Sequence, residues 1–273
     1  MKANRTSRIV IVALLLFFAF CTLFPLYFML VSSVKTNAEL QSNYFGFPIE
    51  PQFHYYGNAM MKIKTYMMNS AFISALSAIG VLILSSLSAY AFARFRFRGK
   101  NALFFTLLVF LMIPGVLTLI PQFVLVKNMG LINSPWAAIL PFIASGQLVT
   151  IFVMRTFFEG IPKELFESIK IDGGSEFRCF LSLVVPFSLP IILSMGLVTV
   201  LNTWNDFFWP LLVLPDQQKM TLTVGLYRFM DQQQILYGQV FSAMSLASVP
   251  LMLLFSFTMK FFVQGLTSGA IKA

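Results

Sequence analysis

Charged residues are scarce in this chain, and so are the side chains from which most metal and nucleophilic sites are built. Only 11% of its 273 residues are charged, whereas a soluble domain carries about 25%. His54 is the only histidine, and Cys21 and Cys179 are the only cysteines. A histidine-based zinc site, a Ser-His-Asp triad and a disulfide framework therefore have little to build on. We expect no catalytic residues, no metal site and no bound cofactor in this chain.

Long apolar runs take the place of the missing charge. Hydrophobic residues make up 58% of the sequence, and several runs reach the roughly 20 residues that cross about 30 Å of hydrocarbon. Backbone groups must be satisfied internally there, and the runs lack the alternation of barrel strands, so we expect helices. The predicted fold class is an all-α membrane protein with six transmembrane helices at residues 9–34, 69–93, 102–126, 136–158, 187–214 and 241–263. Pro114 and Pro121 should kink or interrupt the third span.

The basic residues lie mainly in the short segments between the apolar runs. This pattern is typical of a topology signal and argues against nucleic-acid binding. With the N-terminus inside, the inner segments hold thirteen Lys and Arg residues and the outer segments six. The shortest inner segment carries four of them, at positions 94, 96, 98 and 100. We therefore expect both termini in the cytoplasm.

The expected organisation follows from these spans. The first apolar run is too long for a signal peptide and lacks a clear cleavage site, so it is expected to be retained as a helix. The predicted parts are a cytoplasmic N-terminus (1–8), a first transmembrane helix (9–34), an extracytoplasmic loop (35–68), a core domain (69–264) with a cytoplasmic segment at 159–186, and a cytoplasmic C-terminal tail (265–273).

The cytoplasmic segment has the pattern of two short helices joined by a glycine turn. Pro162 suits the first turn of a helix, and Asp172-Gly173-Gly174 should end it, because glycine tolerates the left-handed conformation. Ser175 is suited to cap a second helix. Apolar residues recur on both helices, at 165, 166 and 169 and at 177, 180, 181 and 184. So much apolar surface must pack on something, either the ends of the chain's own helices or another protein.

This segment resembles the "EAA" signature of binding-protein-dependent (type I) ABC importer permeases, Glu-Ala-Ala-x-x-x-Gly followed further on by Leu/Ile-x-x-Pro. The matching positions hold Glu167, Asp172, Gly173, Leu183 and Pro186. Ser168 and Ile169 replace the two alanines, and Gly173-Gly174 replaces the usual Gly-Ala, which keeps the turn geometry. More of the chain is similar to the maltose-type sugar permeases, in particular to the partner without the long N-terminal extension; the matching stretches are 113–114, Pro121, 130–131, 152–155, 161–164 and 264–272.

The resemblance implies the type I ABC importer permease fold in a bacterial or archaeal cytoplasmic membrane. It implies half of a translocation pathway for mono- or oligosaccharides, shared with a second homologous permease and served by two ATPase subunits and an extracytoplasmic sugar-binding protein. The residues that would contact the ATPase are Glu167, Asp172, Gly173, Gly174 and Pro186 in the segment, and Gln264, Gly265 and Thr267 in the tail. The chain lacks a Gly-x-x-x-x-Gly-Lys-Ser/Thr loop. ATP and Mg²⁺ would therefore be used by the separate ATPase, and this chain is not expected to be an enzyme.

A second group of polar residues lies in the fifth apolar run. Asn202, Asn205, Asp206 and Trp209 are spaced i, i+3, i+4 and i+7, which predicts one helix face. Polar groups in a span usually face a bundle interior or a cavity, and amide, carboxylate and indole groups together suit a sugar. Asp206 lies about 24 Å along a helix from Pro190, near the outer boundary. The group could thus line the pathway, or pack helices, or have its tryptophans in the interfacial aromatic belt and Asp206 solvated or paired.

Two other classes of membrane protein remain as alternatives. A stand-alone ion- or proton-coupled carrier would need paired charges in the membrane or an inverted repeat, and neither is evident. An integral membrane enzyme would need a clustered nucleophile and base, which the sequence does not offer.

Overall fold

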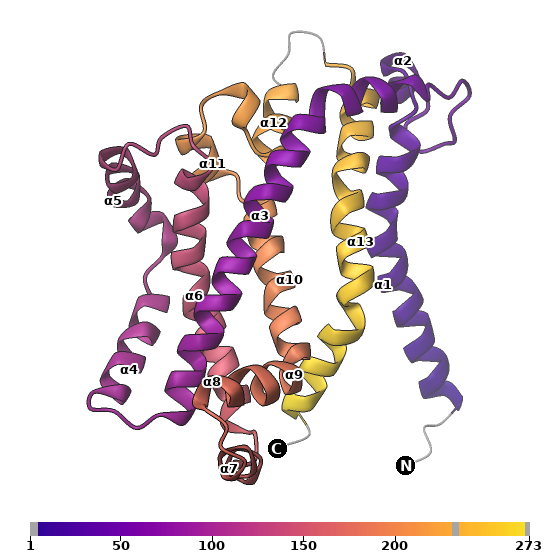
Figure 1. Cartoon of the computed structure of the whole chain (residues 1–273). Coiled ribbons are helices and arrows are strands. Elements are labelled where there is room, and N and C mark those ends of the chain that lie inside the picture. The colour runs from indigo at the N-terminus through magenta and orange to yellow at the C-terminus, as the bar shows by residue number, and fades with distance from the viewer. Residues whose placement is uncertain (1–4, 231–234, 271–273) are drawn as a thin grey trace. The chain divides into compact units, whose positions relative to one another are not determined.

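The computed structural model describes residues 5–230 and 235–270, with side chains from 8 to 260. Every regular element in these ranges is a helix or a helical turn (Figure 1). Four helices are long and apolar enough to cross a membrane, and two sharply bent helix pairs bring the total to as many as six. The prediction of an all-α, multi-spanning protein is confirmed. The chain divides into two compact units.

The first unit comprises Met1–Lys64 and Leu226–Pro250. It contains α1 (Arg5–Ser32), α2 (Asn37–Ser42), the start of α3 (His54–Arg94), the end of α12 (Leu222–Met230) and the first part of α13 (Tyr237–Ala270). Serine hydroxyls join these helices: Ser33 bonds Tyr56 at 2.8 Å, and Ser242 donates to the carbonyl of Ser33 at 2.7 Å. Since α3 begins at His54, residues 54–68 of the expected outer loop are helical. The predicted start of this span, at residue 69, is the point where α3 becomes apolar. The helix itself starts fifteen residues earlier.

The second unit comprises Thr65–Gly225 and Leu251–Ala273. Besides the remaining parts of α3, α12 and α13, it contains α4 (Lys100–Leu111), α5 (Gly115–Asn128), α6 (Trp136–Glu159), α7 (Lys163–Ile171), α8 (Glu176–Cys179), the π-helical turn η1 (Phe180–Val184), α9 (Val185–Phe187), α10 (Leu189–Asn205), α11 (Phe208–Val213) and the 3₁₀ turn η2 (Gln217–Lys219).

The third and fifth expected spans are broken. The α4 and α5 axes meet at 101°, and Pro114 stands at the start of α5, where it cannot continue the α4 hydrogen bonds. Pro121 lies inside α5 without ending it. The segment from Glu176 to Phe187 meets α10 at 76°, with Ser188 at the joint. The predicted interruption at Pro114 is confirmed. In the fifth expected span the helix α10 runs only from Leu189 to Asn205, and the separate helix α11 follows it within residues 187–214.

Candidate functional site

The segment 159–186, which we expect in the cytoplasm and call the coupling segment, folds as two helices joined by a tight turn. Pro162 precedes α7, and Asp172 ends it. Gly173 has a φ of +76°, in the left-handed region that favours glycine, and the amide of Gly174 donates to the carbonyl of Ile169 at 2.8 Å. The hydroxyl of Ser175 then accepts from the amide of Arg178 at 3.3 Å and caps α8. The predicted helix–glycine–helix arrangement is confirmed.

One side of this segment packs on the protein's own helices. Phe166, Cys179, Phe180 and Val184 are buried, together with residues of α3, α6 and α10. Of the apolar residues predicted on the second helix, Phe180 and Val184 are buried, whereas Phe177 and Leu181 are exposed. Phe177 and Leu181 instead line an open apolar hollow together with Leu82, Ile83 and Ser86 of α3.

The other side of the segment is free in this chain. Glu167, Asp172 and Gly173 are exposed, and Gly174 is half-buried. Ile171 is 86% exposed, more than Phe177 at 63% and Leu181 at 51% in the same segment. We call the exposed residues Glu167, Ile171, Asp172 and Gly173 the coupling surface. Pro186, from the same predicted set, is also exposed but lies further along, in α9.

Arg94, the last residue of α3, holds the coupling segment against the end of α6. Its Nη2 atom donates to the carbonyls of Phe158 at 2.9 Å and Ile161 at 2.5 Å. Its guanidinium carbon lies 3.8 Å from the centre of the Phe166 ring, on α7. This is a cation–π arrangement, in which a planar guanidinium stacks well. One side chain thus joins α3, α6 and α7.

Tyr90, one helical turn before Arg94, makes a second connection. Its ring stacks on Phe166 with 6.5 Å between centres, and its hydroxyl donates to Glu176 Oε2 at 2.9 Å. The other carboxylate oxygen of Glu176 pairs with Lys170 at 2.5 Å. This hydrogen bond raises the pKa of Lys170, because the carboxylate favours the charged ammonium. Tyr90, Arg94, Phe166 and Glu176 together are called the α3 clasp below.

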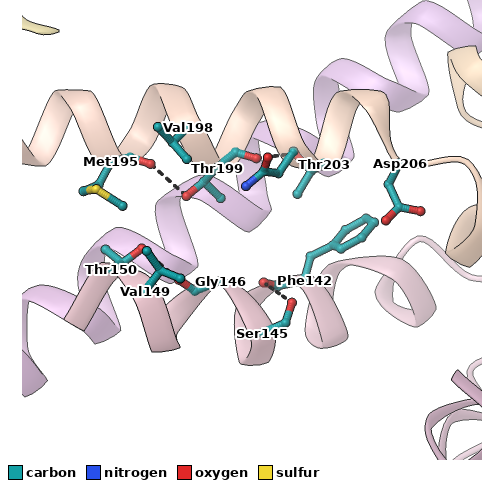
Figure 2. A pocket seen from close by; sticks show the side chains of 11 residues that line it. Phe142, Ser145, Gly146, Val149, Thr150, Met195, Val198, Thr199, Thr203 and Asp206 are labelled. Atoms are coloured by element: carbon teal, nitrogen blue, oxygen red, sulfur yellow. Dashed lines mark hydrogen bonds between the residues drawn. The ribbon is translucent and has the colours of Figure 1, made fainter. Parts of the chain in front are cut away.

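A cavity of about 220 Å³ lies between α6 and α10 (Figure 2). Its walls carry hydroxyl and amide groups from both helices: Ser145 and Thr150 on α6, and Thr199, Asn202 and Thr203 on α10. The hydroxyl of Thr199 donates to the carbonyl of Met195 at 2.8 Å. That bond uses the only proton of the Thr199 hydroxyl. The oxygen therefore acts toward a ligand as an acceptor, through its remaining lone pairs. The cavity therefore offers acceptors and donors next to apolar wall.

The four predicted pathway residues do not share one helix face. The α10 helix ends at Asn205, and Asp206 is extended, with ψ of 129°. Asp206 Oδ1 accepts from the amide of Trp209 at 3.0 Å, in the first turn of the separate helix α11. The expectation of one continuous helix from 202 to 209 is wrong, because the Asp206 carboxylate competes with the backbone and caps the next helix.

The same four residues have different surroundings. Asn202 and Asp206 line the cavity between α6 and α10, and Asp206 also lines a second cavity of about 660 Å³ that reaches α5. Asn205 is exposed, and its amide nitrogen donates to the carbonyl of Leu201 at 2.8 Å. Trp209 is only 4% exposed, and its indole N–H donates to the carbonyl of Ala137 at 3.0 Å. Trp209 and Trp204 are both buried in the protein, so neither faces lipid as a belt residue would.

Comparison with known proteins identifies the chain. A family model described as "binding-protein-dependent transport system inner membrane component" matches residues 81–268, which include α4 to α11 and the whole coupling segment. The chain belongs to this permease family. It is therefore a multi-pass inner-membrane subunit of a transport system.

Individual relatives match the permease over almost its whole length. The arabinooligosaccharides transport system permease protein AraQ of Bacillus subtilis is 31% identical, over 96% of this chain and 95% of that protein. The melibiose/raffinose/stachyose import permease protein MelC of the same species is 31% identical over the full length of both. A chain of a bacterial ABC transporter involved in the import of alginate is 21% identical, with a TM-score of 0.82 over 96% of this chain and 99% of that one. This last likeness confirms the type I ABC importer permease fold.

Tyr90 and Arg94 were not predicted as site residues, since Arg94 served only as a topology signal and no role was expected of Tyr90. The available signal was a tyrosine and an arginine four residues apart at the cytoplasmic end of a span. In the tail, Gln264, Gly265 and Thr267 belong to α13 by their backbone, but their side chains lie outside the described part of the permease. Their contact with an ATPase stays a prediction.

The cap made by Asp206 leads to a stability prediction. Asp206→Ala should destabilise the permease by about 1 kcal/mol, because the amide of Trp209 loses its acceptor. Asp206→Asn keeps an oxygen acceptor at that position and should unfold at the same temperature as the native chain. Thermal unfolding of the detergent-solubilised variants measures the difference. An unfolding temperature for Asp206→Ala equal to that of the native chain would show that the cap contributes nothing.

Proposed function

We propose that this permease is the transmembrane subunit of an ATP-driven importer for sugars, most simply oligosaccharides. The full-length match to permeases whose names specify arabinooligosaccharides and melibiose, raffinose or stachyose carries this proposal. The polar wall between α6 and α10 supports it, since hydroxyl and amide groups form the hydrogen bonds that sugars accept and donate.

The proposed complex includes an ATPase, an extracytoplasmic sugar-binding protein and a second permease. The chain lacks its own nucleotide-binding loop, so ATP and Mg²⁺ would be bound by the ATPase. The coupling surface supports a protein partner: it presents two carboxylates and the exposed Ile171 on a rigid turn. The cavity is walled by α6, α10 and the adjoining Asp206, and a second permease would supply the other half of a pathway.

The described contacts suggest how ATPase closure would reach the cavity. A force on the coupling surface acts on α7, which the α3 clasp ties to α3 and α6. The same segment continues through α8, η1 and α9 to the joint at Ser188, where α10 begins. Because α10 carries Thr199 and Asn202, tilting it at this joint would change the cavity. ATP then drives transport by stabilising the state that the closed ATPase binds best.

Sugar-stimulated ATPase activity tests this function. The permease should be purified with its native partners, reconstituted in lipid, and supplied with the binding protein and a panel of mono-saccharides, oligosaccharides and amino acids. We expect at least one saccharide to raise ATP hydrolysis several-fold, and only when the binding protein is present. Stimulation by amino acids and by no saccharide would overturn the substrate class.

A further inference from the structure

Lys35 lies between α1 and α2 in the first unit, and its side chain is fully buried, at 0% exposure. Its Nζ atom donates to the carbonyls of Asn43 and Gly46, both at 2.6 Å, and of Tyr44 at 3.4 Å. The three protons of an ammonium are thus matched by three backbone acceptors. Burying a lysine is costly unless its charge is well solvated by the protein, so this arrangement needs a reason.

The reason lies in the loop that Lys35 holds, residues 43–49, which we call the aromatic loop. Two further side chains satisfy the carbonyls that Lys35 does not reach: the Tyr27 hydroxyl donates to Phe45 at 3.4 Å, and the Asn43 amide nitrogen donates to Phe47 at 2.9 Å. All five carbonyls from Asn43 to Phe47 therefore have a side-chain donor. Side-chain donors to carbonyls are needed where water does not reach the carbonyls.

The outer side of the aromatic loop is apolar. Tyr44, Phe45, Phe47 and Ile49 are each more than half exposed, with Phe47 at 74% and Ile49 at 78%. No residue between 43 and 49 is charged. The loop therefore presents an apolar surface, bordered at its end by the exposed Glu50 and by Glu39, whose Oε1 accepts from the amide of Ile49 at 2.6 Å.

The contacts of the loop with α1 set its depth. Twenty residues, roughly the thickness of the hydrocarbon, run from Ile9 to Phe28 along α1. The Phe45 ring lies 6.0 Å from both Phe24 and Phe28 on that helix, and the Tyr44 ring lies 4.9 Å from Phe28. These rings are thus level with the last turns of the span, at the outer boundary of the hydrocarbon.

We propose that the aromatic loop is a membrane-inserting element, with its rings among the lipids at the outer boundary between headgroups and acyl chains. Lipid fits better than a protein partner because the loop continues the apolar surface of α1, whose most hydrophobic stretch has no buried residue. Tyrosine and phenylalanine are suited to this depth. Lys35 is a positioning residue: it supplies the donors that water would otherwise supply, and so allows the loop backbone to lie there.

Depth-dependent quenching tests the insertion. In full-length chain with both native cysteines replaced, a fluorophore is attached at Phe45→Cys or Phe47→Cys, and the protein is placed in nanodiscs containing lipids with a nitroxide near the headgroup. Gln41→Cys, on the exposed side of α2, is the matched control. We expect several-fold stronger quenching at 45 and 47 than at 41. Quenching no stronger than at 41 would overturn the proposal, whether water or a protein covers the loop.

Substituting the lysine tests its positioning role. Lys35→Met should reduce quenching at position 45 to the level seen at 41. The carbonyls that lose their donor would be costly to keep in an apolar medium, so the loop would move out to water. Lys35→Arg keeps charged donors and should retain most of the quenching. If Lys35→Met does not insert in the membrane, Asn43→Ala, which removes the donor to Phe47 alone, should give a partial loss at position 47. Quenching as strong in Lys35→Met as with the native lysine would show that Lys35 does not position the loop. Where Asn43→Ala is used instead, unchanged quenching at position 47 would show the same for the Asn43 donor.

Discussion

Gly173→Val should abolish transport while leaving the permease inserted in the membrane. Gly173 adopts φ of +76°, with open space around the position of a Cβ atom. Valine would therefore meet no neighbour, but the left-handed conformation costs a residue with a Cβ atom about 1–2 kcal/mol, and a β-branched residue is a genuine outlier there. The turn would rearrange, and with it the positions of Asp172 and the Ser175 cap.

The chain offers a matched control for this substitution. Gly99, between α3 and α4, has φ of +81° and equally open surroundings, so Gly99→Val introduces the same strain outside the coupling surface. It should retain most of the uptake, and Gly173→Asn should retain uptake too, because asparagine tolerates this conformation. Uptake of the transported sugar, normalised to the amount of inserted permease, is the measurement. Equal losses at positions 99 and 173 would mean that strain alone, and not the coupling turn, limits transport.

Arg94→Ala should uncouple ATP hydrolysis from transport. The substitution removes two hydrogen bonds from a charged donor, to the carbonyls of Phe158 and Ile161, and the stacking on Phe166. Hydrogen bonds to charged groups contribute about 1.5–3 kcal/mol each, so the connection of α3 to the junction between α6 and α7 should weaken by about 3–6 kcal/mol. The ATPase would still bind the coupling surface, but its movement would be absorbed by α7 and would not reach α10.

Two further variants separate anchoring from charge. Arg94→Lys keeps the charge but loses the planar group that bonds both carbonyls and stacks on the ring, so it should rescue little transport. Arg96→Ala removes an exposed arginine two residues away and should behave as the native chain. The ratio of sugar transported to ATP hydrolysed is measured for each. A normal ratio in Arg94→Ala would rule out the α3 clasp as the connection.

Local sequence patterns predicted the coupling turn well. Proline before α7, glycine in the left-handed position and serine at the α8 cap each act within four residues, so their geometry can be read from the chain. The α3 clasp could not be read in this way, because Arg94 and Phe158 are 64 residues apart. Their contact depends on how α3 and α6 pack, which no local rule specifies.

The pathway residues show where periodicity alone misleads. A spacing of i, i+3, i+4 and i+7 predicts a shared face only if the helix is continuous, and Asp206 ends it by capping α11. The indole of Trp209 then finds a carbonyl of α6 and is buried. An aspartate within an apolar run, a residue type favoured at the start of a helix and not in its interior, is the signal that would have indicated this break.

Co-purification of the ATPase with the permease tests the account most directly, since the coupling surface is its central claim. The native chain, Gly173→Val and Gly99→Val should each be expressed with the partner subunits and isolated through a tag on the permease. We predict that the ATPase is recovered with the native chain and with Gly99→Val, and is lost from Gly173→Val. Recovery of the ATPase with all three chains would contradict the assignment of this turn as its docking site.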